Sequence, residues 1–455
     1  MVQMSKKKPV DRSDEKMPIG KLIPLGLQHV LAMYAGAVAV PLIVGAAVKL
    51  SPTQIATLVA LDLFACGIAT LIQAVGIGSF AGIRLPAILG CSFVAVGPLI
   101  SIGLNEGMTT AYGAVIVAGL IVVIIAPLYG KILKFFPPLV TGTILTMIGL
   151  SLIPIGFKNM GGGYVKDFGN PKYLALAFLT IAIVVIFNKF FTGFLQSLSV
   201  LIGLVAGTLV AIPMGLVNTQ IVADSAWFGF AGPLYLGIPK FSLGSIGLMT
   251  LVMLIIMVES TGSFIGIARI VGKDIGEKEI VRGMRAEGLA TVIGGIFNSF
   301  PYTTFSQNIG LVVMTKVYSR WVVISAGIIL MALGLIPKFA ALATVIPAPV
   351  FGGATLMMFS MVAIAGIRML IEVDFNKNGN MLTLCIALGL GIGITVQPDI
   401  LKMMPPLVNT IFHSAITTTA VSAIVLNLVL NWGDHSEFGS NKNNVEIDES
   451  LSENM

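Results

Sequence analysis

Four ionisable side chains lie inside long apolar stretches of this chain, where a charge is costly and therefore usually serves a function. They are Glu259 in LIIMVESTGSF, Glu287 in RAEGLATVIGG, Asp62 in LVALDLFACG and His29 in LGLQHVLAMYAG. A carboxyl group in such surroundings can accept a hydrogen bond from a bound ligand or take up a proton. The chemistry that this set predicts is therefore ligand binding coupled to proton movement.

Each of the four also has a structural interpretation. Glu259 could be a protonated carboxyl bonded to a neighbouring helix, and Glu287, near the start of its stretch, could be an interfacial acid. Asp62 could relay a proton or bond a backbone group, and His29 could be a hydrogen-bonded core residue. Glu259 has no charged residue within nine positions on either side, which favours a functional role for it most strongly.

Two adjacent amides, Gln307 and Asn308, follow the segment FPYTTFS. Each amide offers both a donor and an acceptor, which suits a planar heterocycle with alternating N–H and C=O groups. They could instead only cap a helix. Phe93 could stack on such a ring, although a single Phe also serves as packing.

The composition identifies the class of protein to which these groups belong. Of the 455 residues, 56% are hydrophobic and 11% are charged, against about 25% charged in soluble domains. With a mean hydropathy of +0.97, the chain is predicted to be an all-α polytopic membrane protein. This composition excludes a cytosolic enzyme, a disordered protein and a nucleic-acid binder. The basic pI does not come from a basic groove that binds nucleic acid.

The sequence carries no pattern of a catalytic or metal centre. There is no Ser-His-Asp set, metal-ligand cluster or phosphate loop, so we expect neither an enzyme nor a bound cofactor. Cys66, Cys91 and Cys385 all lie in apolar stretches without disulfide or metal spacing. We interpret them as small buried hydrophobic residues.

Stretches of about 20 apolar residues, the length needed to cross a bilayer, recur fourteen times. They split seven and seven around a loop at 216–242. Their ranges are 23–46, 52–76, 83–102, 108–128, 136–157, 170–188, 196–215, 243–267, 283–299, 300–317, 321–336, 345–367, 380–397 and 407–432.

Charge sets the predicted orientation. With the N-terminus inside, 20 of the 27 Lys and Arg fall on the inner side and 7 on the outer, as the positive-inside rule requires. The first sixteen residues are polar with no cleavage site for a signal peptide. We therefore predict a multi-pass protein of the cytoplasmic membrane with both termini cytoplasmic. We assign no functional role to the tail 433–455.

Weak internal matches indicate a duplication. PLVTG at 138–142 and PVFGG at 349–353 are 211 residues apart, and Pro86 and Pro301 are 215 apart. Because each half has an odd number of spans, the second half is predicted to be inverted. Inverted repeats with broken helices at mid-membrane are typical of secondary transporters.

The segments 85–93 and 300–308 are the predicted breaks. Each has Pro as its second residue and is too short to span a membrane. We predict that both are extended, pair as antiparallel strands and lead into half-helices. The helix N-termini would then converge near Ser92, Phe93, Ser306 and Gln307 as a binding point for an electron-rich ligand. Two ordinary Pro-kinked helices are the alternative.

Several motifs resemble those of the nucleobase–ascorbate transporter (nucleobase:cation symporter-2) family. The resemblance covers residues 20–432. Within the family, the sequence is similar to the bacterial xanthine and uric acid permeases. The motifs are QNIGLVVMTK from Gln307, PYTTF from Pro301, the pair Gln28-His29, Glu259-Ser-Thr-Gly262 and Cys91-Ser-Phe93.

The resemblance implies a domain organisation. A core domain would hold spans 1–4 and 8–11, and a gate domain would hold spans 5–7 and 12–14, in a possible homodimer. The resulting divisions are 1–22 (N-terminal tail), 23–135 (core), 136–242 (gate and outer loop), 243–344 (core), 345–432 (gate) and 433–455 (C-terminal tail).

The resemblance also implies roles for single residues. Glu259 and Gln307 would hydrogen-bond the base, with Phe93, Ser306 and Asn308 helping to hold it. Proton coupling would involve Glu259 and two further residues, Glu287 and His29.

Two departures from the family pattern bear on the substrate. Relatives that carry uracil tend to have Glu at the position of Gln307 and His at that of Ser263. We therefore predict proton-coupled uptake of an oxidised purine, xanthine or urate, with sodium coupling not excluded. The alternatives are a uracil–proton symporter of the same family and a sulfate-type anion transporter of the same fold. The central acid Glu259 argues against an anion as substrate.

Overall fold

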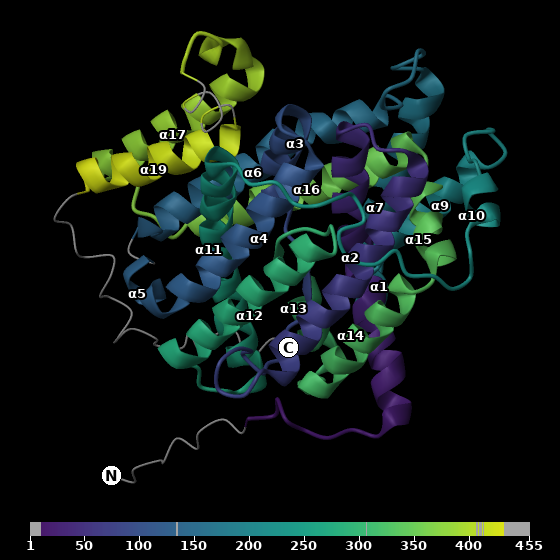
Figure 1. Ribbon diagram of the computed structural model, residues 1–455, viewed down its shortest axis with the longest axis horizontal. Coiled ribbons are helices and arrows are strands. Elements are labelled where there is room, and N and C mark those ends of the chain that lie inside the picture. Colours follow the sequence, from purple (N-terminus) through teal and green to yellow (C-terminus); the bar gives the residue numbers. More distant parts are fainter. Residues whose placement is uncertain are drawn as a thin grey trace.

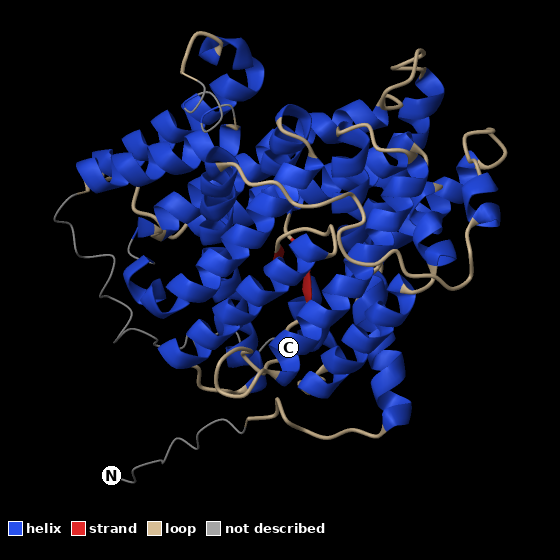
Figure 2. Cartoon of the chain, viewed as in Figure 1, coloured by secondary structure: helices blue, strands red, loops and turns tan. Residues whose placement is uncertain are grey.

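The computed structural model describes residues 11–431 except 133–134, 306, 406–407, 409–411 and 413, and most of it is helical (Figures 1 and 2). The elements of the first half are α1 (Ile19–Ala47), α2 (Pro52–Val75), β1 (Leu89–Cys91), η1 (Phe93–Ala95), α3 (Val96–Asn105), α4 (Met108–Ile125), η2 (Ala126–Leu128), α5 (Tyr129–Ile132), α6 (Pro138–Met160), α7 (Pro171–Phe190), α8 (Phe194–Ser197), α9 (Ser199–Ala211) and α10 (Gln220–Asp224).

The second half repeats the pattern of long helices around one short strand. Its elements are α11 (Leu243–Val271), α12 (Glu277–Ile296), β2 (Tyr302–Thr304), α13 (Gln307–Thr315), α14 (Arg320–Gly334), α15 (Pro337–Thr344), α16 (Ala348–Leu370), α17 (Asn378–Val396), η4 (Pro398–Leu401) and α19 (Ala415–Leu430).

The fold is that of a multi-pass membrane protein. Among the described residues, eight helices are long and apolar enough to cross a bilayer, or nine if the pair α14 and α15, bent by 84°, is one span. Each of the fourteen predicted ranges contains helix, but those of α3, α9 and α19 are short apolar helices of 10–17 residues. The count of fourteen spans and the inverted arrangement of seven and seven therefore stay predictions.

The predicted pair of extended segments is confirmed. β1 and β2 are antiparallel, with Leu89 opposite Thr304 and Cys91 opposite Tyr302, and they lie at the centre of the molecule with helices around them (Figure 2). Backbone bonds extend the pairing on both sides, from Ser92 N–H to the Pro301 carbonyl (2.9 Å) and from Phe305 N–H to the Ile88 carbonyl (3.0 Å). Mutual pairing thus satisfies backbone groups that lipid could not.

The helices form two packing groups. The strand-centred group is α1, α2, α4, α11, α12 and α14, which pack on one another and supply the neighbours of β1 and β2. The flanking group is α6, α7, α9, α16, α17 and α19, in which α6 packs closely along α16. A Cβ on Gly366 of α16 would lie 2.3 Å from the backbone nitrogen of Thr146 in α6, so only glycine permits this approach.

The segment after α10 crosses the strand-centred group. Backbone N–H groups of Gly229, Leu234 and Lys240 donate to carbonyls of Leu335, Ile296 and Thr109, respectively, over 2.8–3.2 Å. This loop belongs by sequence to the 136–242 division but packs on the ends of helices in the other group. It therefore ties the two groups together on one face of the molecule.

The polar N-terminal segment is docked on the opposite face. Arg12 N–H donates to the carbonyl of Val271 (3.2 Å), and the carbonyl of Ser13 accepts from Arg320 N–H (2.8 Å). Asp14 forms an ion pair with the Arg320 guanidinium. These bonds hold residues 12–14 against the ends of α11 and α14.

Candidate functional site

A cavity of about 440 Å³ lies between the strands and the flanking group. One wall comes from β1, β2 and the middle of α11, and the other from α6 and the second half of α16. This volume is in the range of small-molecule sites, about 300–1,000 Å³. Its lining residues include Cys91, Phe93, Glu259, Gly262, Ser263, Thr303, Thr304, Phe305, Leu145, Met361 and Met369.

Glu259 supplies the acid of this cavity. It lies in the middle of α11, where the next residues, Ser260 and Thr261, face the protein interior and are buried. Its Oε2 atom is buried and has no hydrogen-bond partner among the described residues. A buried oxygen without a partner is rare in proteins. Because the Glu259 side chain lines the cavity, its carboxylate is placed to accept a hydrogen bond from an N–H group of a bound ligand.

Glu287 lies behind the cavity and is connected to it by one side chain. It is fully buried on α12, and its Oε1 accepts a hydrogen bond of 2.9 Å from Thr304 Oγ1, which itself lines the cavity. Its Oε2 has no partner among the described residues. The adjacent Thr303 exchanges a 3.0 Å hydrogen bond with Ser260 of α11. β2 thus links the two acidic helices.

Asn308 and His29 are brought together by the fold. The Asn308 amide donates to the His29 carbonyl (3.0 Å) and lies 3.1 Å from His29 Nδ1. With both amide hydrogens used, Nδ1 is the acceptor and the ring proton sits on Nε2. Both side chains are buried and neither lines the cavity. The pair fixes the start of α13 to α1.

Of the other predicted ligand residues that the structure describes, Phe93 lines this cavity. Phe93 lines the cavity at the start of η1 and packs edge-on against Phe359 of α16, with ring centroids 5.8 Å apart. Gln307 begins α13, and Ser306 lies outside the described residues. Ser92 Oγ caps η1 by accepting from Val94 N–H (3.3 Å). Phe93 and Glu259 thus share one cavity.

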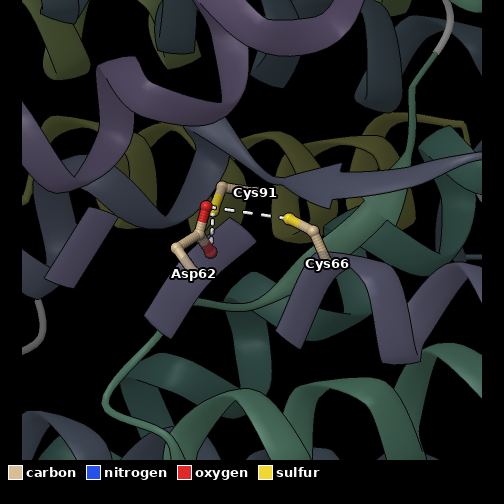
Figure 3. Close-up of side chains that lie close together, drawn as sticks. All are labelled: Asp62, Cys66 and Cys91. Carbon is tan, nitrogen blue, oxygen red and sulfur yellow. Dashed lines mark hydrogen bonds between the residues drawn. The ribbon is translucent and has the colours of Figure 1, made fainter. Parts of the chain in front are cut away.

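Asp62 is the centre of a hydrogen-bond network under the strands. Its Oδ1 accepts from Cys91 Sγ of β1 (2.8 Å), from Tyr302 Oη of β2 (3.1 Å) and from Ser299 Oγ, while its Oδ2 accepts from Cys66 Sγ (3.6 Å). Figure 3 shows both thiols directed at the carboxylate. Cys91 and Tyr302 are cross-strand partners, so one carboxylate holds both strands against α2.

Asp62 belongs to a polar stripe on α2 that sequence reasoning missed. Thr70 Oγ1 accepts from Leu89 N–H (3.1 Å), and Gln73 Oε1 accepts from Ile83 N–H (3.2 Å). Asp62, Cys66, Thr70 and Gln73 recur at helical spacing, so they share one face. That spacing was a readable signal that α2 supports an irregular segment, since buried backbone groups need partners.

The prediction that the three cysteines are small buried hydrophobic residues is confirmed only in part. Cys66 and Cys91 are buried, but they act as hydrogen-bond donors rather than as inert hydrophobic groups. The prediction is wrong for Cys385, which is exposed on α17. The reason is that α17 packs with one side only, leaving the other free for lipid.

The same network contains atoms that could ligate a metal. One ligand atom each from Asp62, Cys66 and Cys91 lies within 4.8 Å of the others, a donor set that zinc uses. Both thiols already donate to the carboxylate, so the network is satisfied as hydrogen bonds. We therefore interpret it as structural support for the strands.

Replacing Asp62 tests this support. We expect Asp62→Ala to lower the free energy of unfolding by about 3–5 kcal/mol, because four buried donors would lose their acceptor. Asp62→Asn keeps the Oδ1 acceptor and should recover most of the loss. The thermal unfolding midpoint of the purified protein in detergent measures both. Equal stability of Asp62→Ala and the parent chain would contradict the interpretation.

Comparisons with known proteins show which family the sequence matches. Residues 20–400 match a family described as "Permease family". The chain is 46% identical over 413 residues to the xanthine permease of Bacillus subtilis (strain 168), covering 90% of this chain and 94% of that one. It is 45% identical over 432 residues to the uric acid transporter UacT of Escherichia coli (strain K12), covering 94% of this chain and 90% of that one.

A solved structure shares the fold at low sequence identity. The transmembrane domain of a cyanobacterium bicarbonate transporter, BicA, superposes with a TM-score of 0.59 and 16% identity, covering 91% of this chain and 99% of that one. At this identity the similarity concerns the fold and not the ligand.

Proposed function

This chain belongs to the nucleobase–ascorbate transporter family, and from that membership we propose that it is a secondary transporter for uptake of an oxidised purine nucleobase, xanthine or urate, driven by protons. The relatives of 45–46% identity are named for these two substrates. The substrate is a small molecule, and the protein is a permease rather than an enzyme.

The observation that carries the proposal is Glu259 on the wall of the 440 Å³ cavity, with a carboxylate whose buried Oε2 has no partner among the described residues. An oxidised purine presents N–H groups along its edge, so one of them would donate to this carboxylate. Phe93 would lie against the ring face. The Gln307 amide, at the start of α13, would take a further N–H or C=O group, and its sequence neighbours Ser306 and Asn308 would support the base.

Proton coupling is proposed to involve Glu259 and Glu287, the acids of the two helices that β2 links. A proton on Glu259 or Glu287 removes a buried charge, which favours movement of a loaded site through an apolar environment. The Thr304 hydroxyl joins the cavity to Glu287, so the occupancy of the site and the state of Glu287 can depend on each other. His29 would act through Asn308.

The movement itself follows from the proposed architecture. The chain would have fourteen spans in an inverted repeat of seven and seven, with both termini cytoplasmic. The strand-centred group would be the core domain and the flanking group the gate, with the cavity between them. The core would move against the gate, in a monomer or a homodimer.

Uptake of radiolabelled xanthine and urate into vesicles with an imposed proton gradient tests the function. We expect uptake that a protonophore abolishes and that is lost when Glu259→Ala and Gln307→Ala are combined. Uptake that ignores the protonophore would overturn proton coupling, and uptake that survives the double substitution would overturn the site.

A competition panel tests the substrate class. We expect unlabelled xanthine, urate and related oxidised purines to compete with labelled xanthine, and uracil and sulfate to have little effect. Competition by uracil at the same concentration as xanthine would replace the purine assignment by the uracil alternative, and competition by sulfate would favour an anion transporter.

A further inference from the structure

A second cavity lies at the end of the molecule opposite the N-terminal segment, and we call it the outer cavity. Its volume is about 420 Å³, nearly that of the deeper cavity beside Glu259. It is lined by the last turns of α1 and α6, the first turns of α2 and α16, and parts of α3 and α15. Its polar or aromatic lining residues are Lys158, Asn159, Tyr164, Thr344 and Phe351.

Of the four polar side chains of the outer cavity, Thr344 donates to the Ala341 carbonyl (2.8 Å), whereas the other three have no hydrogen-bond or ion-pair partner among the described residues. The Lys158 ammonium lies 3.7 Å from the centroid of the Tyr164 ring and forms no ion pair within the described part of the chain. Neither the Asn159 amide nor the Tyr164 hydroxyl has a hydrogen-bond partner there. A cation, an amide and aromatic rings that share an otherwise apolar cavity are complementary to a planar anionic heterocycle.

The two cavities lie along the same interface between the strand-centred and flanking groups. On α6, Leu145 lines the deeper cavity and Pro154 the outer one; on α16, Met361 lines the deeper cavity and Phe351 the outer one. At 1.5 Å per residue, both helices place the nearest lining residues of the two cavities about 14–15 Å apart. Two independent helices thus give the same separation along a common path.

Buried side chains close the path between the cavities. Phe359 of α16 is fully buried and packs edge-on against Phe93. Ile148 and Leu152 of α6, which lie between Leu145 and Pro154, are also buried. A ligand in the outer cavity would therefore be held one step before the site that contains Glu259.

We propose that the outer cavity is a second binding site of this transporter, one that captures the anionic form of an oxidised purine through the Lys158 ammonium. The assignment rests on the proposed function of purine uptake. It also addresses an electrostatic problem of that function. Urate is an anion, and the acid in the deeper cavity, Glu259, would repel it when ionised. A cation before the acid raises the local concentration of an anionic substrate.

The experiment compares urate with xanthine in cells that express the full chain, at a mildly acidic external pH where urate is an anion and xanthine is neutral. Lys158→Gln removes the cation, and Lys158→Arg keeps it. Lys166→Gln is the matched control, because Lys166 is an exposed lysine of the neighbouring loop that does not line the cavity. The amount of each variant in the membrane is measured alongside uptake.

We expect Lys158→Gln to raise the KM for urate by about threefold to tenfold, with Vmax and the KM for xanthine changed less than about twofold. Added salt should raise the urate KM of the parent chain but not that of Lys158→Gln, because salt screens the attraction. Lys158→Arg and Lys166→Gln should behave as the parent chain does.

An unchanged urate KM in Lys158→Gln would overturn the outer site, and so would an equal change in Lys166→Gln. Both results leave purine uptake by the parent chain intact. If the parent chain imports neither urate nor xanthine, the proposed function is wrong and the outer site is overturned with it.

Discussion

Glu259→Gln is expected to lower the ratio Vmax/KM for purine uptake by about 100-fold. The amide keeps the size of the side chain but puts an N–H₂ group in place of one oxygen of a carboxylate that lines the cavity and whose Oε2 has no partner among the described residues. The variant loses a charge-assisted hydrogen bond, and its amide N–H₂ group would face an N–H group of the purine. Together these effects cost about 3 kcal/mol, which corresponds to a factor of about 100. Initial rates of labelled xanthine uptake in vesicles measure it.

The stability of the same variant separates binding from folding. A buried carboxyl oxygen without a partner destabilises the empty protein, so Glu259→Gln should unfold at the same temperature as the parent chain or a higher one. Ser263→Ala is the matched control, one turn along α11 on the same cavity wall, and should keep uptake within about threefold. Uptake by Glu259→Gln at the level of the control would rule out Glu259 as the ligand of the base.

Glu287→Gln is expected to abolish accumulation driven by a proton gradient while leaving exchange of substrate across the membrane. The amide oxygen can still accept from Thr304, whose hydroxyl now donates to Oε1, but the side chain can no longer take up a proton. With one proton per substrate, a gradient of about one pH unit supports about tenfold accumulation. We expect this ratio to fall to about one in the variant.

Glu279→Gln is the control on the same helix. Glu279 lies in the first turn of α12 and forms a 2.6 Å ion pair with Arg282, so its loss removes an acid without touching the cavity. Accumulation and counterflow exchange of labelled xanthine are measured for both variants. Continued accumulation by Glu287→Gln that a protonophore abolishes would exclude Glu287 as the coupling acid.

The class of protein and the break in its helices could be predicted from local sequence. Hydropathy over windows of about 20 residues is enough to identify membrane spans. Pro86 and Pro301, each followed by residues too few to span, predicted the antiparallel pair that β1 and β2 form. These signals are readable because they depend on neighbours in the chain.

The candidate site was predictable only in part. The isolation of Glu259 in an apolar stretch marked it as a ligand residue, and it lines the cavity together with Phe93. The role of Asp62 was left open between a proton relay and a structural bond. In the structure it accepts from both strands, from a residue 29 positions away and from another 240 away.

The sequence by itself determined that this protein is a helical membrane permease, which residues are costly to bury, and where the chain must be extended. Only the tertiary structure decided which of those residues meet: Thr304 with Glu287, Asn308 with His29 across 279 positions, and Glu259 with a cavity. The physical reason is that hydropathy and proline act over one or two turns of chain. The rotation and depth of each helix, which direct its side chains, are set by packing between segments that are distant in sequence.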